Sequence, residues 1–447
     1  MMAPLWSDYL IWLLVLSLLA WARVLRRSPQ VREQWLQIFQ SKIAMVAAIV
    51  LLAYTVVALL DSVRFDAPTQ GPQTLLDVAF GATAEQYERT YSAPFAQVEY
   101  NQSLVTLPNG DVVQQYQPLQ WVQPEASIVW ISAQVLLVVG LITALLIVGH
   151  MVWRARVHGR SLKAYALQVA RGHTRLPWRT AYMALFGVLF IGGWLGYLSQ
   201  FYHVLGTDKV GQDVLYTAVK SIRTGVLIGV LTTLVMLPLA LFLGISAGLF
   251  KGWVDDAIQY LYTTLNSIPG VLLIAAAVLV MQTILNNNPQ WFGSTEERAD
   301  LRLLFLVFIL GMTSWTGLCR LLRAETLKLS QVEFVTSARA FGVGRLTIIM
   351  RHIMPNVMHI VLIAVVLDFS GLVLAEAVLS YVGVGVDPTM HSWGNMINQA
   401  RLEMAREPMV WWSLFSAFIF MFLLVLAANL FSDRVQRVLD PRTQTRQ

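Results

Sequence analysis

Long apolar stretches alternate with short polar segments along this chain. Nine of the apolar stretches are long enough to cross a bilayer as a helix, which takes about 17 to 25 residues. They lie near 5–25, 43–61, 127–152, 179–201, 224–250, 256–284, 303–325, 357–382 and 411–432. Of the 447 residues, 56% are hydrophobic and 13% are charged, against about 25% charged in ordinary soluble domains. The pattern predicts an all-α polytopic membrane protein with about nine transmembrane helices.

The charge of the connecting segments changes sign from one loop to the next. Segment 62–126 holds seven acidic residues against Arg64 and Arg89, whereas segment 153–179 holds seven basic residues and no acid. Basic residues also follow the first stretch and close the chain, at Arg23, Arg26, Arg27, Arg32, Lys42, Arg434, Arg437, Arg442 and Arg446. Because cytoplasmic loops are rich in Lys and Arg, we expect the N-terminus outside and the C-terminus in the cytoplasm. The net charge of +6 then reflects topology and anionic lipid, and it does not indicate a nucleic-acid partner.

One polar stretch, EFVTSARAFGVGRLTIIMRHIMPN at 333–356, separates two apolar runs and is too polar to lie in lipid. Apolar residues recur in and just before its first part at helical spacing, namely Val332, Val335, Ala338 and Phe341. Gly342 and Gly344 should end this helix, and Arg345 to Ile353 should form a second short helix that ends at Pro355. A helical hairpin of this kind suits a groove on a partner protein, although the spacing fits a solvated loop equally well.

Segment 62–126 is long for a loop and is predicted to be a small β-containing cap on the outer side. Within it, Ser103 to Tyr116 (SLVTLPNGDVVQQY) has two strand-like runs around an Asn109-Gly110 turn, a strong hairpin signal. The pattern leaves open whether this cap is purely structural or docks another protein.

Several further positions suggest turns, close packing or interfaces. In HVLGTDKVGQD, at 203–213, two glycines permit tight turns and two aspartates suit helix caps. The pairs Gly225/Gly229 and Gly244/Gly248 suit close helix packing in lipid. Segment 391–401 is predicted to be a short amphipathic helix flat on the outer surface. Tryptophans at span ends are predicted to be interfacial anchors: Trp130, Trp153, Trp178, Trp253, Trp393, Trp411 and Trp412.

Polar side chains inside the predicted spans point to a functional interior or to bonds between helices. Asp368 and Glu376 lie in the 357–382 stretch, and Asn429 lies in the last one. We hold both roles open for Asp368 and favour a structural role for Glu376.

Motifs for catalysis, metals and nucleotides are missing from the sequence. The single cysteine, Cys319, excludes a disulfide framework and a multi-cysteine metal site, and there is no HExxH. There is also no GxxxxGK[ST], so the chain is not expected to hydrolyse a nucleotide itself.

Six segments in one order resemble a known family. They are HVLGTDKVGQDVL, GWVDD, EFVTSARAFGVGRLTIIMRHIMPN, LAEAVLSYVGVGVDP, SWGNMI and NLFSDRVQRVLDPR. Together they resemble the inner-membrane permease subunits of ABC importers for dipeptides, oligopeptides and nickel, specifically the second of the two paired permeases. The resemblance covers about 203–441, and 40–61 resembles that family's first membrane helix.

This resemblance implies a location in the bacterial inner membrane and a set of partners. These are a homologous permease, two cytoplasmic ABC ATPases that use ATP and Mg, a periplasmic substrate-binding protein and the lipid bilayer, with no cofactor in this chain. The implied ATPase-coupling residues are Glu333, Thr336, Ser337, Ala338, Arg339, Gly342, Arg345, Arg351 and Pro355. The implied residues for binding-protein docking and the periplasmic gate are Gly206, Thr207, Asp208, Gly211, Asp213, Trp393, Gly394 and Asn395.

The chain also departs from the family pattern. The usual Glu-Ala-Ala before the central glycine is replaced by Thr336-Ser337-Ala338, and Gln212 replaces the usual arginine before Asp213. Segments 1–39 and 66–200 are additions. We therefore expect N-terminal helices at 1–61, a periplasmic insertion at 62–126, an additional helix pair with a basic cytoplasmic loop at 127–201, a permease domain at 202–441 and a cytoplasmic tail at 442–447.

Two other functions fit a polytopic chain with acidic groups in its spans. A membrane-embedded enzyme would need a nucleophile beside a base, and the sequence shows no such pair. A gradient-driven secondary transporter or channel is the main alternative, and ATP dependence of uptake separates it from an ABC permease.

Overall fold

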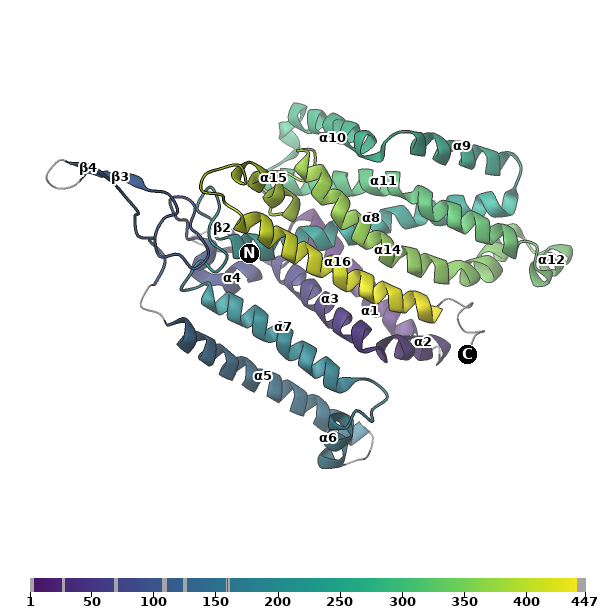
Figure 1. Cartoon of the computed structure of the whole chain (residues 1–447). Coiled ribbons are helices and arrows are strands. Elements are labelled where there is room, and N and C mark those ends of the chain that lie inside the picture. The colour runs from purple at the N-terminus through teal and green to yellow at the C-terminus, as the bar shows by residue number, and fades with distance from the viewer. Residues whose placement is uncertain are drawn as a thin grey trace. The chain divides into compact units, whose positions relative to one another are not determined.

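A computed structural model describes residues 4–25, 29–67, 71–106, 111–123, 127–157, 159 and 161–439, and it is mostly helical (Figure 1). The first helices are α1 (Trp6–Leu25), α2 (Pro29–Phe39), α3 (Lys42–Asp61), α4 (Leu75–Phe80), η1 (Gly81–Ala84), α5 (Ile128–Val157), α6 (Leu162–Ala170) and α7 (Trp178–Leu198). The others are α8 (Val214–Phe250), α9 (Trp253–Ser267), α10 (Gly270–Asn287), η2 (Pro289–Trp291), α11 (Thr295–Leu329), α12 (Glu333–Ala340), α13 (Arg345–Ile348), η3 (Ile349–Ile353), α14 (Met354–Tyr381), α15 (Trp393–Glu403) and α16 (Trp412–Leu439). Strands β1 (Arg64–Ala67) and β2 (Gly71–Thr74), and β3 (Ser103–Thr106) and β4 (Val112–Gln115), form two antiparallel pairs.

Eight helices among the described residues are long and apolar enough to cross a membrane. They are α3, α5, α7, α8, α10, α11, the continuous helix Arg345–Tyr381, and α16. The first predicted stretch is also a helix, α1, whose described apolar part is the shorter Trp6–Ala20. The prediction of a mostly helical, polytopic chain is therefore confirmed.

The predicted span at 256–284 is wrong in its bounds, because two helices share this region. α9 ends at Ser267, Ile268 is extended with φ −92° and ψ 131°, and α10 begins at Gly270. Pro269 explains the break, since a proline disfavours helical geometry in the residue before it. Only α10 is apolar enough to span.

The prediction that a second short helix ends at Pro355 is also wrong. The helix that begins at Arg345 passes through a π-helical turn, η3, and continues as α14, with Pro355 in the first turn of α14. A π turn accommodates a proline because it re-pairs the carbonyls that the missing N–H leaves free. The hairpin is thus a direct extension of a membrane-spanning helix.

Contacts within the chain divide it into two compact units. The first consists mainly of Asp8–Thr224 and His391–Phe431, and the second mainly of Gly225–Met390 with Leu5–Ser7. In the first unit, α4 packs on α5, α7 and the start of α8 through buried Leu76, Phe80 and Tyr216. This core attaches the inserted segment to the membrane helices.

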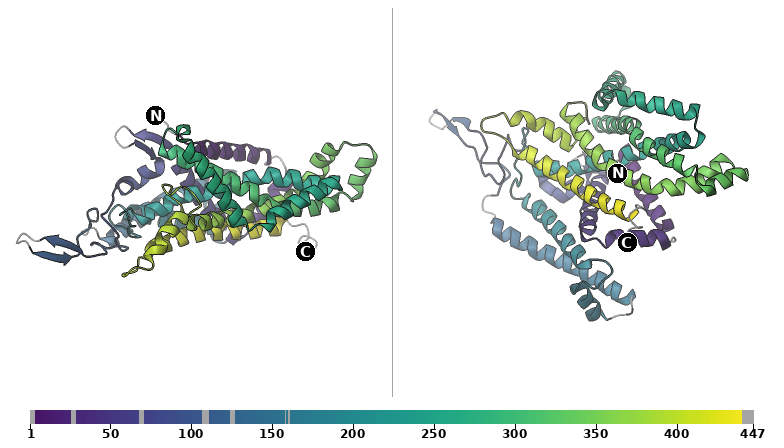
Figure 2. Two further views of the ribbon diagram at one scale, coloured as in Figure 1. Left: turned by 90° about the horizontal axis from the view of Figure 1, so that it is seen from above. Right: turned by 45° about the vertical axis from the view of Figure 1, so that its right-hand side comes forward.

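The inserted segment carries both strand pairs. The predicted hairpin at 103–116 is confirmed in its strands, with Ser103 paired to Gln115 and Thr106 to Val112, while the Asn109-Gly110 turn lies outside the described residues. β3 and β4 project away from the rest of this segment in every view (Figure 2). Arg26, Arg27, Arg160 and the tail from 440 onward, with Arg442 and Arg446, also lie outside the described residues.

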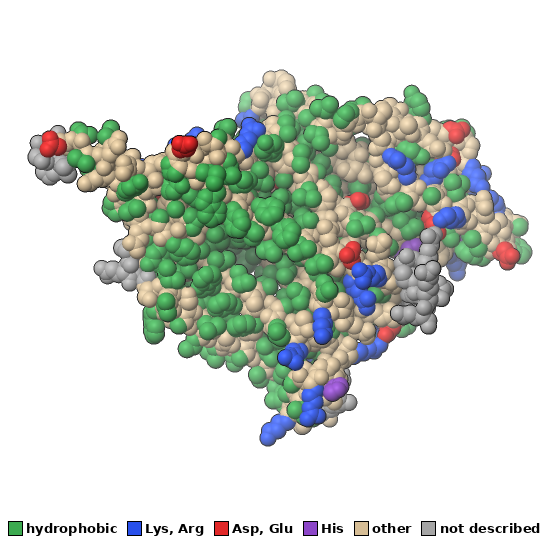
Figure 3. All heavy atoms as spheres, in the orientation of Figure 1, with side chains coloured by type: hydrophobic (Ala, Val, Ile, Leu, Met, Phe, Trp, Pro, Cys, Tyr) green, Lys and Arg blue, Asp and Glu red, His purple; other side chains and the backbone are tan. Residues whose placement is uncertain are grey.

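The added helices α5 and α7 expose apolar side chains along most of their length. Figure 3 shows this green surface, with Lys and Arg side chains gathered at its α6 end. There, the Arg154 guanidinium lies 5.5 Å from the Trp178 ring centroid, and the ring centroids of His150 and Trp178 lie 4.4 Å apart. An apolar surface that ends in arginine and tryptophan is the pattern of a helix pair at a membrane boundary.

In the second unit, α8, α11 and α14 approach closely, as the glycine spacing predicted. A Cβ added at Gly244 would lie 2.8 Å from the Cys319 carbonyl oxygen, and one at Gly248 would lie 2.6 Å from Thr326. The core of this unit runs from Met236 through Leu322 to Val361 and includes residues of the 333–356 stretch. The chain's start also belongs here, because the buried Asp300 carboxylate accepts hydrogen bonds from the Ser7 backbone N–H and hydroxyl.

Candidate functional site

A left-handed glycine turn closes the first helix of the predicted hairpin. α12 ends at Ala340, and Gly342 has φ +74°. The Gly342 N–H donates to the Arg339 carbonyl at 3.0 Å, and the Val343 N–H donates to the Ala338 carbonyl at 3.1 Å. This pair of bonds is a Schellman motif, which favours glycine at this position.

Three apolar side chains hold the hairpin to the membrane helices. Val335 from α12, Ile348 from α13 and Ile353 from η3 are all buried, and they belong to one core with residues of α8, α9, α11 and α14. The helix pair is therefore not an independent loop. A force applied to it acts directly on the packed helices, because close-packed cores transmit displacement.

A second set of apolar side chains on the hairpin is exposed in the part of the chain that the structure describes. Phe341 is 88% exposed, Leu346 73% and Met350 58%. The predicted apolar stripe is only partly correct, since Val335 is buried whereas Val332 and Phe341 are exposed. Exposed aromatic and methionine side chains on a rigid turn are typical of a protein interface.

Polar residues surround this exposed apolar surface. The Arg345 guanidinium lies 5.2 Å from the Phe250 ring centroid, at the end of α8, and the rings of Phe334 and His352 lie 5.9 Å apart. Among the predicted coupling residues, Ala338 is half-buried and the others are exposed, namely Glu333, Thr336, Ser337, Arg339, Gly342, Arg345, Arg351 and Pro355. The structure thus brings the predicted coupling set together on one accessible hairpin.

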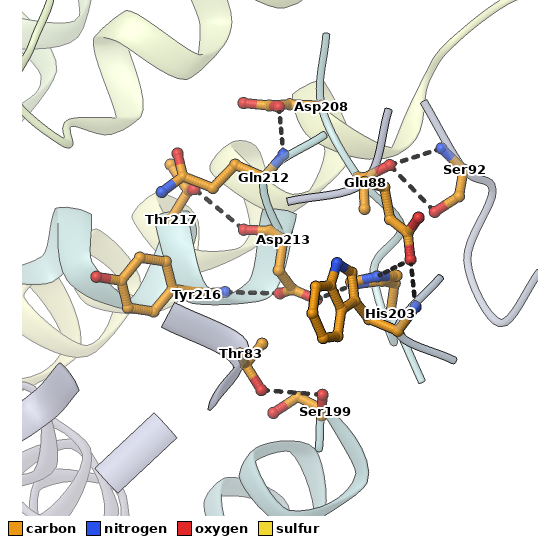
Figure 4. Close-up of polar contacts among 12 residues, drawn as sticks. Thr83, Glu88, Ser92, Ser199, His203, Asp208, Gln212, Asp213, Tyr216 and Thr217 are labelled. Atoms are coloured by element: carbon orange, nitrogen blue, oxygen red, sulfur yellow. Dashed lines mark hydrogen bonds and ion pairs between the residues drawn. The ribbon is translucent and has the colours of Figure 1, made fainter. Parts of the chain in front are cut away.

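The predicted docking loop at 203–213 lies under the inserted segment (Figure 4). The Thr207 N–H donates to the Ser92 carbonyl at 3.1 Å, and the Ser92 N–H donates to the Thr207 hydroxyl at 2.7 Å. A Cβ added at Gly211 would overlap the Glu88 carbonyl, and one at Gly206 would overlap the Ser92 carbonyl. Both glycines are therefore sites of close backbone approach.

A histidine joins two buried carboxylates at this contact. His203 Nδ1 lies 2.8 Å from Asp213 Oδ2, and His203 Nε2 lies 3.4 Å from Glu88 Oε1. Burial lowers the pKa of His203, but the Asp213 and Glu88 carboxylates outweigh burial and raise it above its usual value. Where the family pattern has an arginine before Asp213, this chain thus gives Asp213 a histidine partner.

The two predicted cap residues act differently. Asp213 caps α8, because its Oδ1 accepts the Tyr216 N–H at 3.0 Å. Asp208 instead closes a turn by accepting from the backbone N–H groups of Val210 and Gln212. Burial raises the pKa of Asp208 in spite of these donors.

The structure places most of the residues predicted for docking or the periplasmic gate away from solvent. Gly206, Thr207, Gly211 and Asp213 are buried, Asp208 is half-buried, and the neighbouring Lys209 and Val210 are exposed. The inserted segment supplies the cover, and its contacts lie more than 100 residues away in sequence.

The predicted flat surface helix at 391–401 is also corrected. α15 is a helix at Trp393–Glu403, but Trp393, Gly394 and Asn395 are buried. Trp393 Nε1 donates to the Ala218 carbonyl at 3.0 Å, and Trp412 Nε1 donates to the Thr207 carbonyl at 2.9 Å. These two tryptophans are core residues, so their interpretation as interfacial anchors is wrong.

The polar residues of the spans have separate environments. Glu376 is buried and accepts a hydrogen bond from Ser380 Oγ at 2.6 Å, one turn along α14, which agrees with a structural role. Asp368 is half-buried in the same helix, and Asn429 is exposed on α16. Within the described residues, no group of three or more His, Cys, Asp or Glu is placed to hold a metal ion.

Glu88 and Ser92 carry no motif that sequence reasoning could have recognised, and His203, although it begins the 203–213 motif, was given no role. Their partners are set by tertiary packing across more than 100 residues. The unusual glycine pair at Gly206 and Gly211 was the available signal, because it marked a backbone that another backbone approaches.

Comparison with known proteins places this architecture in a family. Residues 240–445 match the family described as "Binding-protein-dependent transport system inner membrane component". The glutathione transport system permease protein GsiD of Pectobacterium atrosepticum is 30% identical over 243 residues, covering 54% of this chain and 74% of that protein. The oligopeptide transport system permease protein OppC of Haemophilus influenzae is 31% identical over 242 residues, covering 54% of this chain and 71% of that protein.

A solved structure titled "Inward facing conformations of the MetNI methionine ABC transporter" shares 14% identity and a TM-score of 0.38, over 50% of this chain and 96% of that one. A likeness this low supports no inference about helix arrangement.

The two permease relatives are sufficient to assign the family, and they decide against a gradient-driven transporter or channel. Such importers work with ATPase and binding-protein partners. The chain therefore belongs to the inner membrane components of binding-protein-dependent transport systems, and it is a multi-pass permease subunit of an ABC importer, corresponding to the second of the paired permeases and acting without catalysis or a cofactor of its own.

Proposed function

We propose that this permease subunit forms half of a path for a peptide or a small peptide-like solute, together with a homologous permease. Two cytoplasmic ATPases would supply the energy. The substrate class rests on the relatives, whose names specify glutathione and oligopeptide transport. The paired permease and the two ATPases follow from the family resemblance of the six sequence motifs.

The observation that carries the coupling role is the hairpin at 333–356. It is anchored by buried Val335, Ile348 and Ile353, and it exposes Phe341 and Leu346 at its turn. We infer that this exposed surface enters a cleft of the ATPase. Closure of the ATPases on ATP would move the hairpin, and the shared core would pass that movement to the membrane helices, as alternating access requires.

We propose that the charge pattern sets the orientation. The N-terminus and segment 62–126 would lie in the periplasm, and the hairpin, the 153–179 segment and the C-terminus would lie in the cytoplasm. The segments 1–61, 62–126, 127–201 and 202–441 would act as N-terminal helices, outer insertion, added helix pair and permease domain, followed by the tail at 442–447.

A substrate-binding protein would dock on the outer side. Because Ser92 and its neighbours cover Thr207, this partner would meet Asp208 to Val210 and the inserted segment first. Trp393, Gly394 and Asn395 would position the gate from within the fold, since they are buried.

The test uses two substitutions of Gly342. No atom lies within 4 Å of a Cβ added there, so only the left-handed backbone opposes a side chain. Gly342→Val should distort the turn, because a β-branched residue is strongly disfavoured at positive φ, whereas Gly342→Asn should be tolerated.

The readouts are ATP hydrolysis and solute uptake by the reconstituted complex. We expect Gly342→Val to lose uptake while retaining ATPase activity or losing ATPase association, and Gly342→Asn to keep both. Normal uptake by the valine variant would contradict the coupling role of this hairpin. Competition of uptake by di-, tri- and oligopeptides, with Ni²⁺ as the control solute, tests the substrate class separately.

A further inference from the structure

Helix α9 has three distinct faces, although it is only 15 residues long. One face is buried against α11. The Arg323 guanidinium donates to both Asp255 oxygens, at 2.5 and 2.6 Å, and the Arg320 guanidinium lies 5.2 Å from the Tyr262 ring centroid. Ile258 lies between these contacts in the core.

A second face is exposed and mainly apolar. Trp253 is 80% exposed, and Leu261 is also exposed on this face. They recur at helical spacing with exposed Ala257 and Thr264. This composition fits contact with lipid.

The third face is polar and is largely exposed among the described residues. Asp256, Gln259, Thr263 and Asn266 recur at i, i+3, i+7 and i+10, which places them in one row. Asp256, Thr263 and Asn266 are exposed, and Gln259 is half-buried. Tyr260 and Ser267 stand at the boundary with the apolar face.

One end of this polar row is hydrogen-bonded to α11, a helix long and apolar enough to cross a membrane. Thr316 Oγ1 donates to Asn266 Oδ1 at 3.2 Å, and Thr316 belongs to the apolar part of the α11 span. Polar side chains at membrane depth are costly against lipid, and they face protein or a water-filled cavity. The break at Ile268 and Pro269 then separates this polar-faced segment from the fully apolar α10.

The same helix is joined to the coupling hairpin. α9 begins three residues after Phe250, over which Arg345 lies, and Ile258 and Tyr262 share one core with Val335 and Ile348. α9 and α10 lie along α11 at one edge of this unit (Figure 1). The polar row is therefore on the hairpin side of the break.

We propose that the polar row of α9, Asp256, Gln259, Thr263 and Asn266, lines the solute path in the half of the membrane next to the hairpin. This inference rests on the proposed coupling role. Because α9 and the hairpin share a core, movement of the hairpin shifts this lining directly. A hydrated polar lining suits a solute with peptide amide groups, because the lining replaces the hydrogen bonds that the solute makes with water.

The single native cysteine makes the test direct. In a Cys319→Ala background, Thr263→Cys places a thiol on the polar row, and Leu261→Cys, two residues away, is the matched control on the apolar face. The complete complex is placed in inside-out membrane vesicles. Each variant is treated with a charged, impermeant methanethiosulfonate and, separately, with uncharged N-ethylmaleimide.

We expect the charged reagent to modify Thr263→Cys at least about tenfold faster than Leu261→Cys, because only a hydrated thiol forms the reactive thiolate. The rate at Thr263→Cys should also change when the ATPases are trapped with vanadate. Slow, equal modification of both thiols would overturn the proposal. Modification of Thr263→Cys in the isolated chain but not in the complex would also overturn it, and would assign the row to the contact with the second permease.

Uptake by the wild-type complex into proteoliposomes that enclose ATP, with the solute and its binding protein outside, separates the two hypotheses. ATP-independent uptake would refute the coupling proposal, while selective modification of Thr263→Cys would still establish α9 as a lining helix. ATP-dependent uptake with a protected Thr263→Cys would refute only the lining.

Discussion

Close approach of two backbones fixes the inserted segment to the loop before α8. The Glu88 N–H donates to the Gly211 carbonyl at 2.9 Å, and Gly211 has φ +80°. His203 then joins Asp213 to Glu88 in the same contact. Steric fit and charge therefore act on one set of residues, and each can be tested by a single substitution.

Gly211→Ala should loosen the inserted segment more than backbone strain alone predicts. An alanine at positive φ costs about 1 to 2 kcal/mol, and here its methyl group would also overlap the Glu88 carbonyl. Gly172→Ala is the matched control, because Gly172 has φ +73° and no atom within 4 Å of an added Cβ. Limited proteolysis of 85–121 and thermal unfolding in detergent measure the difference. If the two substitutions have equal effects, the backbone at Glu88 moves away from the added methyl group at little cost in free energy.

The stability of this contact should fall as pH rises. The folded-state pKa of His203 is raised above 6.5, so protonated His203 stabilises the fold fully below pH 6.5, and the stabilisation is lost as pH rises through the folded-state value. Hydrogen bonds to charged groups contribute about 1.5 to 3 kcal/mol. His203→Gln should destabilise the chain at low pH and flatten the pH dependence above about pH 6.5, since the glutamine carries no titrating proton.

Thermal unfolding at several pH values measures this dependence. Exposed His173 supplies the control, because His173→Gln should leave the profile of the wild type unchanged. A profile that stays equally steep in His203→Gln would assign the pH dependence to another group.

The elements themselves differ in how far the sequence predicts them. Apolar length predicted the first residues of α3, α5, α7 and α16 to within about one residue, because burial in lipid requires only length and hydrophobicity, whereas α5 and α16 continue beyond their predicted ends. The positions at which helices end or continue past a proline were less predictable. Pro269 ends a helix and Pro355 does not, since the π turn before Pro355 absorbs the missing N–H. Burial of Thr207 and Trp393 depended on partners far away in the sequence, which no local pattern encodes.

Within the hairpin, substitutions of exposed and of buried side chains should have different effects. The first should weaken ATPase docking, and the second should lower the free energy of unfolding. Phe341→Ala removes an exposed ring and should leave the free energy of unfolding within about 0.5 kcal/mol of wild type, while it weakens ATPase association. Val335→Ala removes a buried side chain and should cost about 2 kcal/mol. Co-purification of the ATPase and thermal unfolding are measured for both. A Phe341→Ala complex as stable as the wild-type complex would place the ATPase elsewhere.

Contacts inside the first unit restrict how many times the chain can cross the membrane between the two contacting segments. The inserted segment touches Thr207 through Ser92 and reaches Met409 through Tyr100, whose hydroxyl donates to the Met409 carbonyl at 3.1 Å. Contacting segments outside the spans lie on one side of a membrane. α5 and α7 provide two crossings between the first pair, and α8, α10, α11 and α14 provide four before Met409. The second count is even only because α9 is not a separate crossing.

We propose from the same count that the hairpin lies on the side of the membrane opposite the inserted segment, because three candidate spans, α8, α10 and α11, separate it from Thr207 along the chain. Single cysteines test this in the Cys319→Ala background. Gln114→Cys on β4 should react with an impermeant maleimide in intact spheroplasts, whereas Arg171→Cys and Thr336→Cys should react only after permeabilisation; all three positions are exposed. Labelling of Thr336→Cys from the outside would require an even number of crossings between Thr207 and the hairpin. That result would contradict both the count and the assignment of the hairpin to the cytoplasmic ATPases.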